Sequence, residues 1–289
     1  MNTKTLLASA LAILAVPAIM AQTVYDPALV IPEYEQNKTS SYNSADFQTN
    51  VQSVMEATDE SDIKKFRQNS DSPMGFISSG DGNIMMRGAN SGAGSSDEIG
   101  TMNGNGGCFI EVDNSFTQVP RNDDGSYGPI NLPFNFNLYG TNYSQVYINT
   151  NGNLTFTGGY YAYSSSGFPF SLPMVAPFWG DVDTRAGGAI YFKVNPTNMI
   201  VTWNGVGYYS VNTSKLNTFQ VVIGTNNDAE TGFGQNVCFR YKDMQWTTGQ
   251  ASGSSNGFGG IPATVGINKG SYSNYIQVGR FNQNNAAYD

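Results

Sequence analysis

The chain has 289 residues and a formal net charge of −8, from 14 lysines and arginines against 22 aspartates and glutamates. This acidic balance offers no cationic surface to phosphate groups, so nucleic acid is not an expected partner. The sequence contains no histidine, which excludes Ser-His-Asp and Cys-His nucleophiles and every zinc site that needs a histidine ligand.

Residues 1–21 have the pattern of an export signal. Lys4 provides a positive start, an apolar run follows from Leu6 to Val16, and cleavage is expected before Gln22. The apolar run is shorter than the roughly 20 residues that span a bilayer, and no later segment reaches that length. We therefore predict a secreted or cell-surface protein with no transmembrane segment.

Residues 22–105 form a polar leader in which Gly, Ser, Asn and Asp are frequent. This composition has little apolar mass to offset the entropy lost on ordering, so we expect a poorly ordered, largely flexible leader. Loosely helical spacing of apolar residues, with Asp46 as an N-cap, makes one short helix near residues 46–66 the alternative.

From about residue 106, short apolar runs rich in Tyr, Phe, Val and Thr alternate with turn residues. None of the runs has the length or the 3.6-residue period of a strong helix. This spacing predicts an all-β domain over residues 106–289, built as an antiparallel β-sandwich or barrel. The expected strands are Cys108–Val112, Ile130–Leu138, Val146–Thr150, Leu154–Thr157, Ala189–Val194, Met199–Val206, Thr218–Gly224, Val237–Trp246 and Ala263–Ile267.

Two turn sequences are expected to join neighbouring strands. Asn151-Gly152 tolerates positive φ at both central positions, which predicts a two-residue hairpin turn. Asn195-Pro196-Thr197-Asn198 predicts a second hairpin turn.

The two cysteines of the chain, Cys108 and Cys238, are too few for a four-thiolate metal site. An exported chain meets an oxidising compartment, where an even number of cysteines favours disulfide formation. We predict one disulfide, Cys108–Cys238, with two separate buried thiols as the alternative.

Asp181 and Asp183 alternate across Val182, so on a strand they would share one face. Together with backbone oxygens they could bind Ca²⁺, which takes six to eight oxygen ligands. The alternative is structural pairing, for example with Arg185. A glycosidase needs two carboxyl groups on opposite sides of the scissile bond, whereas these two would project the same way. We therefore predict no catalytic residues, and no cofactor other than Ca²⁺.

Aromatic residues gather in a Gly/Ser-rich loop just before these carboxylates. They include Tyr160, Tyr161, Tyr163 and Phe168. Exposed aromatics in such a loop can stack on sugars or anchor a protein partner, because they bring contact area at low entropic cost. The alternative is that they fold back over the edge of the sandwich.

Several segments, in this order, resemble the nidogen-like extracellular domain family. They are Pro133–Phe136, Ile148–Phe156, Ala176–Arg185 with Gly188–Tyr191, Leu216–Ile223, Phe239–Trp246 and Ala263–Ile267. The resemblance covers roughly residues 106–280 and implies a β-sandwich. It also implies a non-catalytic extracellular interaction module for cell-matrix or surface adhesion, with an extracellular protein or glycan as its partner. A carbohydrate-active protein, lectin-like or a glycosidase using Asp181 and Asp183, is the alternative.

The surroundings of the domain allow two further expectations. The export signal and the Asn/Gly-rich composition are typical of a bacterial surface protein. Residues 281–289 show no terminal cap, anchor or sorting pattern, so we expect a fragment of a longer protein that is truncated at its C-terminal end.

Overall fold

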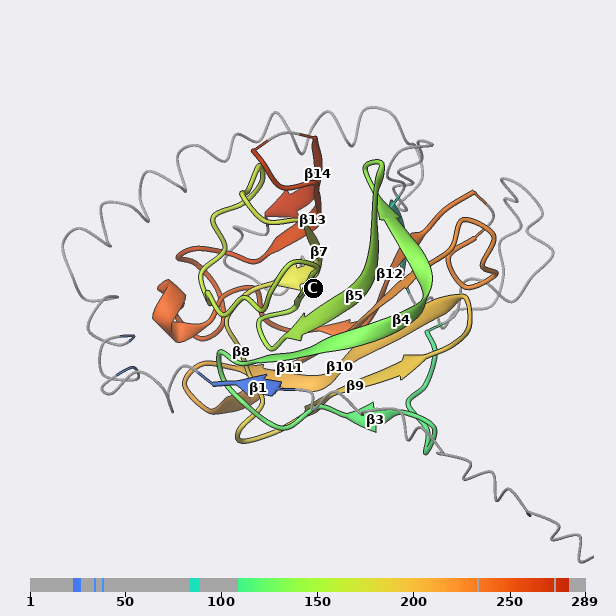
Figure 1. Cartoon of the computed structure of the whole chain (residues 1–289). Coiled ribbons are helices and arrows are strands. Elements are labelled where there is room, and N and C mark those ends of the chain that lie inside the picture. The colour runs from blue at the N-terminus through green and yellow to red at the C-terminus, as the bar shows by residue number, and fades with distance from the viewer. Residues whose placement is uncertain are drawn as a thin grey trace, which may run out of the picture.

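A computed structural model of the chain describes residues 23–26, 34, 38, 84–88, 109–232, 234–272 and 274–280. Nearly all regular structure in this part is β-strand, arranged in two packed sheets (Figure 1). The predicted all-β sandwich is confirmed. No helix among the described residues has the length and apolar character needed to cross a bilayer. The predicted export signal and the helix near 46–66 lie outside the described residues.

The first sheet is antiparallel throughout, with the strand order β1-β4-β5-β6-β7-β13-β14. Its strands are β1 (Thr23–Tyr25), β4 (Ser126–Leu138), β5 (Thr141–Asn149), β6 (Asn153–Thr155), β7 (Met174–Trp179), β13 (Thr264–Asn268) and β14 (Tyr275–Arg280).

The second sheet has the order β2-β12-β11-β10-β9-β3, and β8 also pairs with β10. Its pairs are antiparallel except β2 with β12, which is parallel. The strands are β2 (Ile84–Gly88), β3 (Thr117–Gln118), β8 (Val182–Asp183), β9 (Ala189–Val194), β10 (Asn198–Tyr208), β11 (Asn212–Gly224) and β12 (Val237–Met244). A short 3₁₀ helix, η1 (Gln250–Ser252), precedes β13.

Aromatic side chains fill the core between the two sheets. Phe178 of β7, in the first sheet, packs with its ring centroid 5.3 Å from that of Phe219 of β11, in the second. Phe219 is in turn stacked on Trp203, at 5.0 Å. Phe178 also meets Trp246 edge-on at 5.2 Å. These pairs join the two sheets through large aromatic surfaces.

The turn between β5 and β6 is longer than the predicted two-residue hairpin. Asn149 pairs with Asn153, which leaves three residues in the turn, and of these only Gly152 has positive φ, at 76°. A Cβ atom on Gly152 would overlap the carbonyl oxygen of Phe178. The turn is therefore shaped by close packing against β7, which requires glycine at this position. The predicted turn at Asn195–Asn198 is confirmed, with a 2.8 Å hydrogen bond from Asn195 N to Asn198 O.

The N-terminal part of the domain differs from the prediction in two ways. Residues 109–112, expected within the first strand, form none. Instead, the backbone of Ile110 bonds to the side-chain amide of Gln220, which replaces a strand partner. In the leader, by contrast, β1 and β2 each add a strand to a sheet edge, and Lys38 is buried. The sandwich therefore includes parts of the leader that its polar composition did not predict.

Candidate functional site

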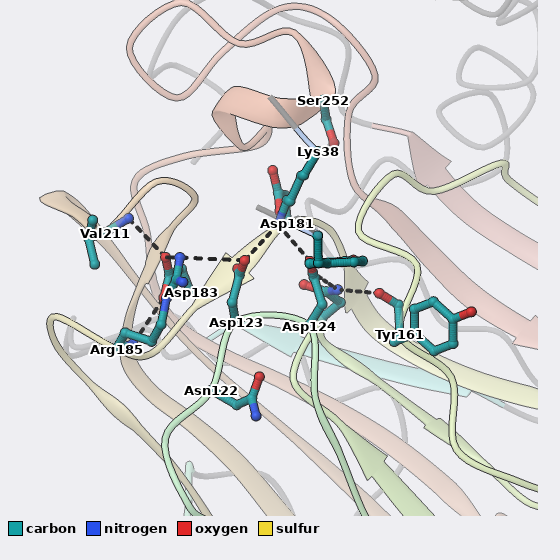
Figure 2. Close-up of polar contacts among 12 residues, drawn as sticks. Lys38, Asn122, Asp123, Asp124, Tyr161, Asp181, Asp183, Arg185, Val211 and Ser252 are labelled. Atoms are coloured by element: carbon teal, nitrogen blue, oxygen red, sulfur yellow. Dashed lines mark hydrogen bonds and ion pairs between the residues drawn. The ribbon is translucent and has the colours of Figure 1, made fainter. Parts of the chain in front are cut away.

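Three buried carboxylates surround the ammonium group of Lys38 (Figure 2). Lys38 Nζ lies 3.0 Å from Asp123 Oδ2, 2.8 Å from Asp124 Oδ2 and 2.8 Å from Asp181 Oδ1. None of these four side chains is more than 4% exposed. Buried charges persist only when they are paired, so this cluster is a specific arrangement of the fold. We call the carboxylates of Asp123, Asp124 and Asp181 the aspartate pocket.

Two chain segments far apart in sequence build the aspartate pocket. Asp123 and Asp124 lie just before β4, and Asp181 lies between β7 and β8. Asn122 and Thr184 hold the two segments together: Asn122 N donates to Thr184 Oγ1 at 2.8 Å, and Thr184 N donates to Asn122 O at 3.0 Å. The sandwich topology thus brings the carboxylates to one place.

The oxygens of the aspartate pocket differ in how well they are satisfied. Asp124 accepts hydrogen bonds from Asn151 Nδ2 at 2.7 Å and from the hydroxyl of Tyr34 at 2.8 Å. Asp123 Oδ1, Asp181 Oδ2 and Asn151 Oδ1 are buried and have no hydrogen-bond partner among the described residues. The pocket therefore has unused acceptor capacity even with Lys38 in place.

Asp183 lies beside the aspartate pocket but has its own partners (Figure 2). Arg185 holds its carboxylate in a bidentate pair, with Nε 3.0 Å from Oδ1 and a terminal nitrogen 2.7 Å from Oδ2. The backbone N–H of Val211 also donates to Oδ2, at 2.8 Å. This matches the structural pairing that the sequence left open as the alternative for Asp183.

Two tyrosine rings line the space around the Lys38 ammonium. Nζ lies 3.9 Å from the ring centroid of Tyr209 and 4.5 Å from that of Tyr163. Rings at these distances attract a cation through their negative faces. Carboxylates and aromatic rings thus both stabilise positive charge at this site.

Burial and the closeness of several charges shift the pKa values of the ionisable groups in the pocket. Burial raises the pKa of Asp181 to about 6, and Lys38 opposes this shift. Burial, followed by repulsion from Asp124, also holds the pKa of Asp123 well above its ordinary value. Burial alone would lower the pKa of Lys38, but Asp181, Asp124 and Asp123 raise it well above its usual range. Lys38 therefore stays charged, while two of the aspartates hold protons more tightly than in water.

The predicted metal ligands, Asp181 and Asp183, are both buried and lie next to the core residue Val182. The structure nevertheless groups Asp181 with Asp123 and Asp124, whose ligand oxygens all lie within 4.8 Å of one another. Neither of these two partners was among the predicted site residues, although adjacent acids in a turn before a strand were a visible signal. The sequence around Lys38, in the polar leader, contains no comparable signal.

The predicted aromatic loop folds back over the sandwich for most of its length. Phe168 is buried with its ring 6.2 Å from that of Trp179, and Tyr160 packs edge-on against the same ring at 5.7 Å. Tyr163 faces Lys38. Tyr161 is 40% exposed, so it is the member of the predicted set that a partner could reach directly.

Cys238 is buried in a small apolar cluster with Ile200 and Val222. Ile110 packs against this cluster. Cys108 lies outside the described residues, and no disulfide occurs among those described. The Cys108–Cys238 bond stays a prediction.

Several known proteins resemble part of this chain. It is 32% identical to alpha-tectorin of Gallus gallus over 192 residues. This alignment covers 56% of this chain and 9% of that protein. Over 176 residues it is 29% identical to nidogen of Drosophila melanogaster, covering 45% and 12%. Dendrite extension defective protein 1 of Caenorhabditis elegans is 27% identical over 157 residues, covering 44% and 13%. The chain thus spans about a tenth of the length of these relatives, and no solved structure matches it.

The family comparison covers more of the chain than any of these relatives. Residues 101–288 match the family described as NIDO related. This segment includes the three residues of the aspartate pocket and leaves Lys38 outside. It also agrees with the resemblance to nidogen-like domains seen in the sequence. The chain belongs to the NIDO-related family.

Proposed function

We propose that this chain is a non-catalytic extracellular interaction module that acts in cell-matrix or surface adhesion. Family membership carries the proposal, because similar proteins include an alpha-tectorin and a nidogen. The predicted export signal at residues 1–21 agrees with a secreted or cell-surface location. The partner would be an extracellular protein or glycan.

The contact surface that we assign to such a partner is a pair of exposed tyrosines in two adjoining loops of the first sheet. Tyr161 is 40% exposed and Tyr272, in the turn between β13 and β14, is 67% exposed. The two loops are joined by backbone hydrogen bonds, from Ser271 N to Ser171 O and from Tyr272 N to Phe170 O, both 3.2 Å. We call Tyr161 and Tyr272 the tyrosine edge. Large, rigid, amphipathic side chains of this kind dominate protein interfaces.

The half-buried Tyr160 connects the two members of the tyrosine edge. Burial raises the pKa of Tyr160 to about 12, with smaller contributions from Tyr161 and Tyr272. Tyr160 precedes Tyr161 in the chain and packs against Phe170, whose carbonyl oxygen accepts the hydrogen bond from Tyr272 N. Tyr160 itself rests on Trp179 and Phe170, which gives the exposed rings a rigid base.

The buried carboxylates support a non-catalytic role over a glycosidase. Asp181 and Asp183 are at most 1% exposed, and both face cationic side chains of the same chain. A glycosidase must present two carboxyl groups to the sugar from opposite sides of the bond. Neither aspartate is presented to a substrate in this arrangement.

Adhesion can be measured with beads that carry the full chain, held against a matrix-coated surface under flow. We expect the wild-type beads to be retained, and the Tyr161→Ser/Tyr272→Ser double variant to reduce retention at least fivefold. Val211→Ser is the matched control, because Val211 is also an exposed apolar side chain in a turn. Retention no greater than that of uncoated beads, or equal retention of all three proteins, would refute the proposal.

The carbohydrate alternative makes a different prediction. A lectin-like protein would bind defined sugars on a glycan array, and a glycosidase would release sugar with wild type but not with Asp181→Asn/Asp183→Asn. Sugar release that depends on these two residues would overturn the non-catalytic assignment. Array binding without hydrolysis would identify the partner as a glycan.

A further inference from the structure

The aspartate pocket already holds a cation in the form of the Lys38 ammonium. Nζ lies 2.8–3.0 Å from one oxygen of each of the three carboxylates. Calcium binds its oxygen ligands at about 2.3–2.6 Å, so an ion at the Nζ position would need inward shifts of only about 0.5 Å. The carboxylates therefore converge on a point that suits a metal ion.

The ligands of the pocket suit a hard cation. The three ligand atoms are all carboxylate oxygens and lie within 4.8 Å of one another. Ca²⁺ accepts such oxygens in flexible geometry, whereas Mg²⁺ demands near-ideal octahedral geometry and gives up its waters reluctantly. A buried cluster of carboxylates therefore favours Ca²⁺ over Mg²⁺.

Carboxylates outnumber the cationic groups at the pocket. The aspartate pocket and Asp183 together present four carboxylates to the cationic groups of Lys38 and Arg185. A divalent ion in place of the ammonium would add one positive charge to this group.

Unpartnered oxygens at the same place independently point to a cation. Asp181 Oδ2 and Asp123 Oδ1 make no hydrogen bond among the described residues. The side-chain oxygen of Asn151, a neutral residue only 1% exposed, is also unpartnered, while its nitrogen is bonded to Asp124. All are acceptors, and buried acceptors are satisfied by a metal ion and its waters.

The pocket and the lysine that fills it come from different parts of the chain. Asp123, Asp124 and Asp181 lie within residues 101–288, which match the family, and Lys38 lies outside them. The domain therefore provides the pocket, and the leader provides the ammonium that occupies it.

We propose that the aspartate pocket is a Ca²⁺ site that Lys38 caps in this chain, so that Ca²⁺ binding and the docking of Lys38 exclude each other. Asn151 Nδ2 donates both to Asp124 and to the backbone oxygen of Tyr161, so the site adjoins the tyrosine edge (Figure 2). The proposed Ca²⁺ binding does not depend on the proposed adhesion. Its consequence is that the cation would control whether this part of the leader is docked on the sandwich.

Terbium luminescence tests the site directly in the full chain, because Tb³⁺ substitutes for Ca²⁺ and nearby tyrosine rings excite its emission. Tyr163 and Tyr209 lie within 4.5 Å of the Nζ position. We expect Lys38→Met to bind Tb³⁺ at least tenfold more tightly than wild type, and added Ca²⁺ to displace it. Adding Asp124→Asn to Lys38→Met should abolish binding, whereas adding Asp113→Asn, a change at an exposed carboxylate, should not.

Equal Tb³⁺ affinity of wild type and Lys38→Met, or emission that survives Asp124→Asn, would overturn the proposal. A second measurement on wild type needs no variant and so does not depend on the folding of one. Trypsin cleaves after lysine, and Lys38 is buried. We expect millimolar Ca²⁺ to speed cleavage after Lys38 at least threefold relative to the same concentration of Mg²⁺. An unchanged rate would contradict exclusion between Ca²⁺ and Lys38.

Discussion

Lys38 Nζ lies 2.8 Å from Asp181 Oδ1, which joins the N-terminal leader to the segment between β7 and β8. Both side chains are almost fully buried, so the contact is a buried ion pair. A buried ion pair contributes little to stability compared with apolar packing, but removing one partner leaves the other unpaired in a medium of low dielectric constant.

Replacing Lys38 with alanine should destabilise the protein strongly. Three buried carboxylates would lose their ammonium, and we expect the free energy of unfolding to fall by about 3–5 kcal/mol at pH 7. Urea unfolding in the presence of EDTA measures this loss without contributions from divalent cations. Lys242→Ala is the matched control, because Lys242 forms an exposed ion pair with Glu111 and should cost about 0–1 kcal/mol. Equal losses in the two variants would contradict the buried pairing.

Stability should fall as the pH rises through the range in which Asp181 ionises. Burial raises the pKa of Asp181 to about 6 in the folded state, against about 3.9 in the unfolded chain. Between these values the folded state binds more protons, so this contribution is complete below about pH 4 and is lost as the pH passes about 6. The difference of about two pKa units corresponds to about 3 kcal/mol.

Urea unfolding of wild type and Asp181→Asn at pH 4 and pH 7 separates this effect from the titration of other groups. Asparagine cannot ionise, so the variant should lose less stability than wild type between the two pH values. Identical pH dependence of the two proteins would show that Asp181 does not titrate in this range.

Glycine should be far more important at residue 152 than at residue 140, although both have positive φ, at 76° and 83°. A Cβ atom at Gly152 would overlap the Phe178 carbonyl, whereas one at Gly140 would meet no atom within 4 Å. Gly140→Ala should lower the free energy of unfolding by about 1–2 kcal/mol, because alanine is strained in the left-handed region. Gly152→Ala should have the same strain and lose about 1–3 kcal/mol more, because its Cβ atom overpacks the site. Thermal unfolding of both variants compares them, and a Gly140→Ala loss as large as that of Gly152→Ala would disprove the packing explanation.

We predict a disulfide between Cys108 and Cys238. Ile110, two positions after Cys108 in the sequence, packs against the apolar cluster that contains Cys238. Alkylation of the denatured, unreduced protein followed by mass spectrometry should find neither cysteine modified. Two alkylated cysteines in protein purified from an oxidising compartment would rule the bond out.

The strands of the sandwich could largely be predicted from the sequence, because their signal is local. The alternation along β4 buries Ile130, Leu132 and Phe134 on one face, and this pattern is visible in the residues themselves. The β5–β6 turn was located correctly at Asn151-Gly152. Its length was not, because the contact between Gly152 and Phe178 joins segments that only the folded sheet brings together.

The aspartate pocket could not be assembled from the sequence for the same physical reason. Asp181 was recognised as a candidate ligand, but its neighbours Asp123 and Asp124 are brought to it by sheet topology. Lys38 lies in a polar leader, where a lysine is expected to be solvated. β1 and β2 pair through backbone groups, which require no apolar pattern in the leader.

The burial of Lys38 in the aspartate pocket is the central claim, and lysine reactivity tests it most directly. Brief treatment of the native full-length protein with an amine-acetylating reagent, followed by mass spectrometry, compares Lys38 with Lys242, whose side chain is 46% exposed. We predict that Lys38 is modified at least tenfold more slowly than Lys242, and equally fast in denatured protein. Equal modification of the two lysines in the native protein would contradict the account.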